Sequence, residues 1–251
     1  MHRRSPGITR PRISLAVSAS IVALVGLTSC GPAPTQSGIS DPYEAQNRKI
    51  YESSVRTDKA ILRPVALAVG KVLPPKVQIG VTNFADNLEL PGRVVNDLLQ
   101  ANLEMAAQNT VRFAINSTFG LAGLLDPATK LGAPGKKTDF GETLHIWGVG
   151  EGNYVVVPLI GPSTDRDMLG KVVDVALDPL RLIVPKPAHL GFGANVAAKI
   201  IDRGRYSETV DSILYDSADG YAQARLLYLQ NRRYQLGETP PDASFEDPYA
   251  K

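Results

Sequence analysis

Apolar residues in this chain fall into short runs at helical spacing, and glycine or proline interrupts most of the runs. The run at residues 111–126, VRFAINSTFGLAGLLD, combines large apolar side chains with two glycines, Gly120 and Gly123, that interrupt any helix it forms. A helix that crosses a bilayer needs about 20 largely apolar residues, so this run is too short to cross. It is therefore either part of a core or a segment that lies in a membrane interface.

Helical spacing predicts that the chain is mostly α from residue 41 onward. Asp41 followed by Pro42 is a helix-start signal, because Asp caps a helix and Pro fits its first position. Prolines predict breaks at residues 63–64, 73–75 and 90–92. The expected helices are 43–62, 65–72, 75–90, two helices within 93–117 that meet at Ala101–Asn102, 165–180 with an apolar continuation to 187, 195–203, 207–215 and 218–235.

Residues 154–160, YVVVPLI, are the best strand candidate, because the run is short and rich in β-branched side chains. Pro158 confines this strand to a sheet edge or a two-stranded ribbon. The preceding residues 131–144 are polar and contain glycine and proline, which predicts a loop. Thr164 and Asp167 have the spacing of a capping box at the start of the next helix.

Residues 1–29 have the pattern of a secretion signal: a basic start, an apolar stretch at 13–27, and small residues before Cys30. This pattern resembles the bacterial lipobox, in which the cysteine thiol is diacylated and the new amino terminus is acylated after cleavage. The alternative, a buried free thiol, requires all three features to coincide by chance. Two or more acyl chains make a stable membrane anchor. Gly31 stands where Asp would retain a lipoprotein at the inner membrane, so we expect delivery to the outer membrane.

Cleavage before Cys30 removes four of the 27 basic residues and no acidic ones, which leaves 23 basic and 25 acidic residues, a formal charge of −2. A nucleic-acid-binding protein would carry a basic stripe, so we expect no nucleic-acid partner. Residues 30–40 contain Gly, Pro, Ser, Thr and Gln, and should form a flexible tether behind the acylated cysteine. The folded part is expected at residues 41–236, followed by a disordered tail at 237–251.

Catalytic and metal-binding patterns are weak in the mature chain. His145 and His189 are its only histidines and Cys30 its only cysteine, so a transition-metal site is not expected. The sequence around Ser163, GPSTD, approaches a nucleophile elbow but lacks the second glycine, so capping is the better role for Ser163 or Thr164. A serine hydrolase is nevertheless the class of enzyme that is worth testing for this chain.

Three further patterns have structural interpretations. Gly148, Gly150 and Gly152 do not have the spacing of a nucleotide-binding loop, so we expect them to make turns. Asp139 and Glu142 are candidates for a carboxylate pair, but in a polar loop they should simply be solvated. His145 is expected to be a hydrogen-bonded structural residue.

By composition alone, a chain that lies in one membrane leaflet and a compact helical lipoprotein with an ordinary core explain the apolar runs equally well.

A series of short motifs resembles the MlaA/VacJ family of outer-membrane phospholipid-transport lipoproteins. The match covers about residues 41–235 in the family's order, and departs from it at Ala45–Gln46, where the family commonly has Gly-Phe. The motifs are DPYE with NR at 41–48, RPV at 63–65, NF with NL at 83–88, RF through NSTFGL to DPA at 112–128, DFGETL at 139–144, WGVG at 147–150, and VPLIGPST with RD at 157–167.

The resemblance implies a mostly α, single ring-like helical domain with a short β-ribbon, embedded in the periplasmic leaflet of the outer membrane. It implies no enzymatic activity and no cofactor other than the acyl chains on Cys30. Phospholipids misplaced in the outer leaflet would pass through a polar-walled channel to a soluble periplasmic lipid carrier, with a trimeric porin as membrane partner, and this transport would maintain lipid asymmetry. The alternatives are a lipid-acting hydrolase of the phospholipase kind and a purely structural envelope lipoprotein.

Within the 111–126 run the resemblance allows specific assignments. As a hypothesis, the polar residues lie near the channel and the large apolar residues face lipid, while the glycines let the backbone bend. The polar set is Asn116, Ser117 and Thr118, and the apolar set is Phe119, Leu121, Leu124 and Leu125.

Overall fold

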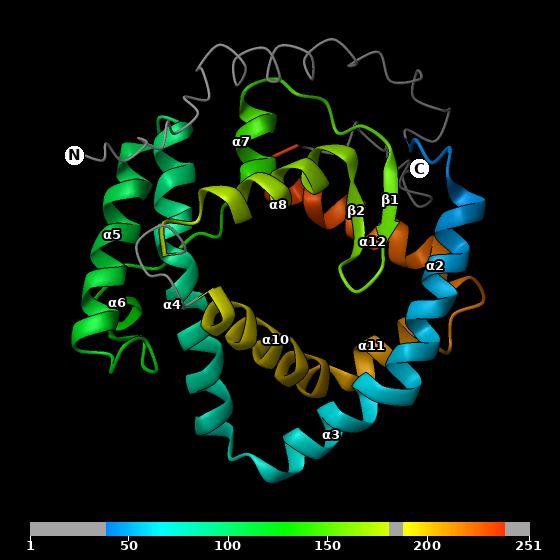
Figure 1. The fold of residues 1–251 in the computed structure, drawn as a ribbon, viewed down its shortest axis with the longest axis horizontal. Coiled ribbons are helices and arrows are strands. Elements are labelled where there is room, and N and C mark those ends of the chain that lie inside the picture. Colours follow the sequence, from blue (N-terminus) through cyan, green and yellow to red (C-terminus); the bar gives the residue numbers. More distant parts are fainter. Residues whose placement is uncertain (1–38, 181–187, 239–251) are drawn as a thin grey trace, which may run out of the picture.

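The computed structural model of the chain describes residues 39–180 and 188–238 (Figure 1). These residues are mostly helical and include one two-stranded antiparallel ribbon, as the sequence predicted. The elements are α2 (Glu44–Thr57), the π turn η1 (Asp58–Leu62), α3 (Arg63–Val72), α4 (Pro75–Leu99), α5 (Leu103–Thr118), α6 (Pro127–Lys130), α7 (Phe140–Ile146), β1 (Tyr154–Val157), β2 (Gly161–Thr164), α8 (Asp165–Leu177), α10 (Ala188–Arg205), α11 (Ser207–Leu214) and α12 (Gly220–Gln235).

Several predicted features lie outside the described residues: the signal peptide, Cys30, nearly all of the tether, residues 181–187, and all of the tail beyond Glu238. Among the helices that the structure describes, none is both long enough and apolar enough to cross a membrane.

The predicted helix start at Asp41–Pro42 and the predicted break at Arg63–Pro64 are both wrong. Helix α2 begins at Glu44, and the Asp41 carboxylate instead accepts hydrogen bonds from Asn47 and from two residues of α12. Helical structure continues from α2 through η1 into α3, with Pro64 in the first turn of α3. The wider π turn accommodates the proline at a point where a regular helix would be broken.

The predicted break at 90–92 is also wrong, because α4 runs without interruption from Pro75 to Leu99 with Pro91 inside it. Proline removes one helical hydrogen bond, but α4 packs along α5 on one side and α10 on the other, and this packing maintains the helix. The predicted joint at Ala101–Asn102 is confirmed: Ala101 has a φ of 57°, and the Asn102 side chain caps α5 by accepting from the Met105 amide at 3.2 Å.

The remaining boundaries differ more locally. Residues 131–144 do not form one loop, because α7 begins at Phe140. Strand β1 ends at Val157, so Pro158 lies in the turn, and β1 pairs with β2 in the register Tyr154 with Thr164. Helix α8 ends at Leu177, and α10 is longer at both ends than predicted. The Thr164 side chain caps α8 through the Asp167 amide at 3.3 Å, as predicted.

The helices form a closed circuit. Helices α2, α3 and α4 follow one another along the outer edge in Figure 1. At one end of this edge, Asn96 of α4 donates to Asp174 of α8 at 2.8 Å. At the other end, Asn47 of α2 bonds to the free edge of β1, donating to the Tyr154 carbonyl at 3.1 Å and accepting from the Val156 amide at 2.9 Å. Because β2 runs directly into α8, these bonds close a ring, inside which α10 packs on α3 and α4.

Among the residues that the structure describes, the apolar cores of the ring are small. One contains Tyr154, Val156, Tyr221 and Leu229, and the other contains Ala85, Ala194 and Ala198. Many of the buried side chains are polar or charged, whereas many large apolar side chains are exposed. A soluble domain normally buries its large apolar residues, so the exposed ones mark surfaces that are candidates for contact with lipid or with another protein.

The segment after α5 is a tight turn built on the two glycines. Leu121, Ala122 and Gly123 all have positive φ, and Gly120 and Gly123 are buried while the leucines are exposed. A Cβ atom at residue 120 would lie 2.4 Å from the Asn116 carbonyl oxygen, and one at residue 123 would lie 2.5 Å from the Asn87 Cβ. Gly120 is therefore required by the close approach of another backbone segment, and Gly123 by the close approach of the Asn87 side chain.

We expect Gly123→Ala to destabilise the fold more than Gly132→Ala. Both glycines have positive φ, 97° and 86°, which costs an L-residue about 1–2 kcal/mol. Only residue 123 meets a neighbour, the buried Asn87, and overpacking adds about 1–3 kcal/mol. Urea unfolding of the detergent-solubilised protein measures both changes, and equal effects would contradict this account of the turn.

Candidate functional site

A cavity of about 440 Å³ lies between α4, α8, α10 and the segment that leads into α7. One part of its lining is apolar, contributed by Leu88, Val175, Leu180, Leu190, Phe192 and Val196. The other part is polar or charged, contributed by Glu89, Arg93, Asn96, Thr138, Asp139, Asp174, Asp178, Asn195 and Lys199, and two glycines, Gly92 and Gly191, complete it. Ligand pockets typically have volumes of about 300–1,000 Å³, so the cavity can hold part of an amphipathic molecule.

Helical spacing explains why these residues meet. Glu89, Arg93 and Asn96 recur at intervals of four and three on one face of α4, and Asn195 and Lys199 are four apart on α10. The polar residues therefore form stripes along helices that face the cavity. The two lining glycines leave open space, because a Cβ atom added at Gly92 or Gly191 would have no neighbour within 4 Å.

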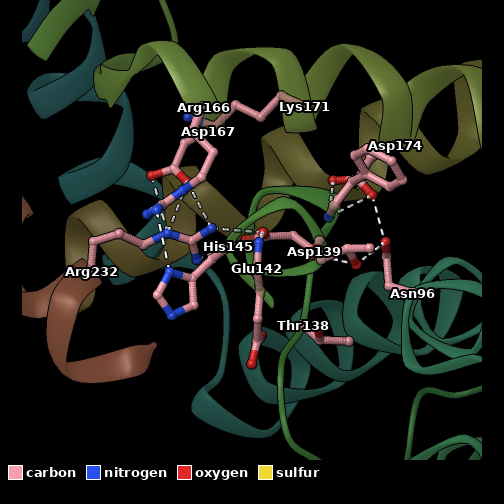
Figure 2. A network of polar contacts seen from close by, with 12 residues as sticks. Asn96, Thr138, Asp139, Glu142, His145, Arg166, Asp167, Lys171, Asp174 and Arg232 are labelled. Atoms are coloured by element: carbon pink, nitrogen blue, oxygen red, sulfur yellow. Dashed lines mark hydrogen bonds and ion pairs between the residues drawn. The ribbon is translucent and has the colours of Figure 1, made fainter. Parts of the chain in front are cut away.

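Asp174 ties three helices together at the cavity wall (Figure 2). Its carboxylate accepts from Asn96 Nδ2 at 2.8 Å and from the Phe140 amide at 3.1 Å. Burial raises the pKa of Asp174, and the two hydrogen bonds only partly offset that rise. Its main role is thus to hold α4, α7 and α8 in place.

Behind this wall, Arg232 of α12 binds two carboxylates from different helices (Figure 2). It contacts Asp139 at 2.7 and 2.9 Å and Asp167 at 2.9 and 3.0 Å. Burial alone would raise the pKa of Asp167, but hydrogen bonds from Arg232 and Tyr228 outweigh it and lower that pKa below its usual value. Asp139 also caps α7 through the Glu142 amide at 2.8 Å.

Comparison with known proteins identifies the family. The MlaA lipoprotein family matches residues 39–235. The chain belongs to the MlaA lipoprotein family. This result confirms the resemblance seen in the motifs.

Individual relatives cover most of the chain. The intermembrane phospholipid transport system lipoprotein MlaA of Escherichia coli strain K12 is 32% identical over 95% of both chains, and its Haemophilus influenzae counterpart is 28% identical over 89% of this chain and 90% of its own. An uncharacterized protein of Rickettsia felis is 36% identical over 74% of both. A solved structure from work on the structural basis for maintenance of bacterial outer membrane lipid asymmetry has a TM-score of 0.68 and 31% identity, covering 78% of this chain and 99% of that one.

In this MlaA-family fold, the three polar residues predicted near a channel do not line the larger cavity. Asn116 is buried and holds the α6 region, donating to Asp126 at 3.0 Å and accepting from the Ala128 amide at 3.1 Å. It also lines a second, smaller cavity of about 100 Å³ between α4, α5 and residues 126–137. Ser117 accepts from Asn87 at 3.1 Å, and the exposed Thr118 donates to its own helix at Ala114.

The four apolar residues predicted to face lipid are all exposed. The exposed fractions are 79% for Phe119, 65% for Leu121, 43% for Leu124 and 53% for Leu125. The segment that carries them follows the end of α5, and α5 flanks α4 on the outside of the ring (Figure 1). This placement suits lipid contact, which stays a prediction.

The weaker candidates have structural roles. Ser163 is fully buried and accepts from Lys171 Nζ at 2.9 Å, so it has no access to a lipid ester. Gly148 lies in a turn and has positive φ, as predicted, whereas Gly152 has positive φ outside a turn and Gly150 has neither feature. His145 lies 3.4 Å from Arg166 Nη1 and 3.3 Å from Glu238. Over the side chains that the structure describes, residues 39–180 and 190–238, no three His, Cys, Asp or Glu residues are grouped to hold a metal ion.

The expectation that Asp139 and Glu142 are merely solvated is wrong. Asp139 pairs with Arg232, and Glu142 is buried and pairs with Lys136 at 2.9 Å. Sequence reasoning missed the lining residues Arg93, Asn96 and Lys199. The signal that could have found them was a polar stripe on helices that are otherwise apolar, but that stripe identifies a cavity only when the partner helices are known.

We expect Arg232→Gln to destabilise the protein by about 3–5 kcal/mol near neutral pH, because the buried Asp167 carboxylate loses its hydrogen-bonded cation and keeps only Arg166, 3.7 Å away. The exposed pair of Arg48 with Asp219 provides a control, and Arg48→Gln should cost at most about 1 kcal/mol. Urea unfolding of the solubilised protein compares the two variants.

The pH dependence follows from the lowered pKa of Asp167. A carboxylate with a folded-state pKa below 3.8 stabilises the fold above that pH and loses this contribution as the pH falls through the folded-state value. Wild type should therefore lose stability on acidification below about pH 4. The difference in unfolding free energy between wild type and Arg232→Gln should become smaller there. A difference that stays constant between pH 7 and pH 3 would contradict the assignment.

Proposed function

We propose that this chain is an outer-membrane lipoprotein that removes misplaced phospholipids from the outer leaflet through the cavity in its ring and so maintains lipid asymmetry. The observation that carries this proposal is the two-sided lining of the cavity, with polar and charged residues of α4 and α8 opposite Leu190, Phe192 and Val196 of α10. The naming of relatives as phospholipid transport lipoproteins supports it.

The physical requirement for such a protein is a polar path for the head group. A charged head group dragged through hydrocarbon costs several kcal/mol unless polar groups accompany it. The cavity supplies those groups, and its apolar side accommodates the first carbons of the acyl chains. The rest of the chains can stay in lipid.

The ring is proposed to lie in the periplasmic leaflet of the outer membrane, anchored by the acyl chains on Cys30. A leaflet position requires an apolar outer face and no crossing helix. The exposed residues Phe119, Leu121, Leu124 and Leu125 supply part of that face, and the described helices are all too short or too polar to cross.

Two partners follow from this position. Acyl chains that leave the ring toward the periplasm cannot cross water unshielded, so a soluble periplasmic lipid carrier must receive them. A trimeric porin is the proposed membrane partner, because a ring confined to one leaflet needs a neighbour that spans both to reach outer-leaflet lipid.

Transport of this kind needs no covalent step, and we propose that the chain is not an enzyme. Ser163, the serine whose sequence context approaches a nucleophile elbow, is buried in the fold, and its hydroxyl accepts a hydrogen bond from Lys171. A purely structural envelope lipoprotein would have no use for a charged cavity inside its ring.

Blocking the cavity tests the proposal. Gly191→Trp places an indole in the cavity, where a new side chain meets no atom within 4 Å of its Cβ. Gly70→Trp is the matched control, because Gly70 also lies in a helix with open space around it but lines neither cavity. We expect cells with Gly191→Trp to accumulate outer-leaflet phospholipid, as we also expect of a deletion, while cells with Gly70→Trp remain like wild type.

Mass spectrometry of lipid that co-purifies with each variant completes this test. Intact phospholipid should accompany wild type and Gly70→Trp but be depleted in Gly191→Trp. Hydrolysed lipid would instead support the phospholipase alternative. Normal asymmetry with a folded Gly191→Trp protein would exclude transport through this cavity.

The leaflet position is tested at the exposed turn. The double variant Leu121→Asp with Leu124→Asp places two charges where lipid contact is proposed. At the centre of a membrane helix, inserting one such charge costs about 2.5–3.5 kcal/mol. Asp tolerates the positive φ of residue 121 better than most residues, so the backbone should hold. We expect surface-exposed phospholipid and detergent sensitivity, whereas Met at both positions should behave as wild type. A stable Asp variant with a normal barrier would refute the lipid contact.

A further inference from the structure

The cavity has two basic side chains, and they come from different helices. Arg93 lies on α4 and Lys199 on α10. Since α10 packs on α4 inside the ring, the two residues line one cavity from two neighbouring helices. Two cations that line one cavity can bind an anionic group that enters it.

Four carboxylates also line the cavity, but each already has a partner. Asp139 binds Arg232, and Asp174 accepts from Asn96 and from a backbone amide. Asp178 accepts from the Leu180 amide at 3.0 Å, and Glu89 pairs with Arg93 at 2.6 Å. Asp139 and Glu89 are thus paired with arginines, and the other two accept hydrogen bonds within the protein. Of the four, Glu89 shares Arg93 with an incoming anion and so competes with it directly.

The two basic groups retain donors. Both protein contacts of Arg93 go through Nη2, to Asp86 at 3.0 Å and Glu89 at 2.6 Å, which leaves the N–H groups on Nε and Nη1 for another acceptor. Lys199 is exposed and makes no hydrogen bond or ion pair with any residue that the structure describes. The Arg93 side chain is only 8% exposed, so an anion that reaches it is shielded from water and bound more strongly.

We propose that Arg93 and Lys199 bind the phosphodiester of the lipid in the cavity and thereby make the chain selective for phosphate-bearing lipids over neutral diacylglycerols. This inference rests on the proposed function. The phosphodiester is the group that all phospholipids share, and it carries a full negative charge with several acceptor oxygens. Glu89 weakens phosphodiester binding at this site, because it competes with the phosphodiester for Arg93.

The test offers the purified full-length lipoprotein in detergent an equimolar mixture of dioleoyl phosphatidylethanolamine and dioleoylglycerol. The two lipids have the same chains and differ in the phosphate-containing head group. Mass spectrometry of the retained lipid gives their ratio. Wild type should retain mainly the phospholipid, and Arg93→Gln and Lys199→Gln should each lower the ratio about tenfold, as expected for the loss of one charge-assisted contact.

Glu89→Gln should act in the opposite direction and raise the ratio, because the competing carboxylate is gone. A purely structural role for the Arg93–Glu89 pair would not produce this increase. Lys71→Gln is the matched control: Lys71 is exposed on α3, lines neither cavity and should leave the ratio unchanged. Lys199 is exposed, so its variant should fold even if Arg93→Gln does not.

The outcomes separate the inference from the proposed function. If wild type retains both lipids equally, or if Lys199→Gln and Glu89→Gln leave the ratio unchanged, the phosphodiester site is refuted while transport through the cavity stands. If wild type retains neither lipid, the proposed function itself fails, and the inference fails with it.

Discussion

Arginines near the end of the chain hold carboxylates from its first two thirds, and the ring depends on these pairs. Arg203 of α10 binds Asp58 at 2.8 Å, and Arg232 of α12 binds Asp139 and Asp167. Buried ion pairs add little net stability when compared with apolar residues of the same size, but breaking one is costly. Their contribution here is geometric, because each pair fixes one helix relative to another that is distant in sequence.

This dependence follows from the shape. A ring of helices around a cavity has few places where apolar side chains from several elements can meet, and the apolar clusters in the described part of the chain are accordingly small. Polar residues such as Asn47, Asn96 and Asn109 are almost fully buried and bonded instead, and large apolar residues such as Phe119 are exposed. The arrangement is the reverse of a soluble domain and suits a protein surrounded by lipid outside its ring.

The same polar interior serves the proposed transport. Asn96 and Asp174 both close the ring and line the cavity, so the bond that completes the fold also forms part of the polar wall. Arg93 has a comparable double role, since it is held by acids of its own helix and faces both cavities. Fold and site are therefore built from one set of residues.

Helix content, the ribbon at Tyr154–Val157, the joint at Ala101 and the family could all be determined from the sequence, because each depends on short-range periodicity, turn residues or ordered motifs. The helix breaks that the sequence predicted at Pro64 and Pro91 are not present in the structure. Proline limits a helix locally, but a π turn absorbed the first, and packing of α4 between α5 and α10 maintained the helix around the second.

The cavity was decided only by tertiary structure. Asp139 and Arg232 are 93 positions apart, and Asn96 and Asp174 are 78 apart, so neither pair has a local signature. Residues 111–126 illustrate the division: the sequence determined that Gly120 and Gly123 interrupt a helix with apolar residues around them. The structure decided that Asn116 turns inward to hold Asp126 while Leu121 stays exposed, because that choice depends on which neighbouring helices are present to cover each face.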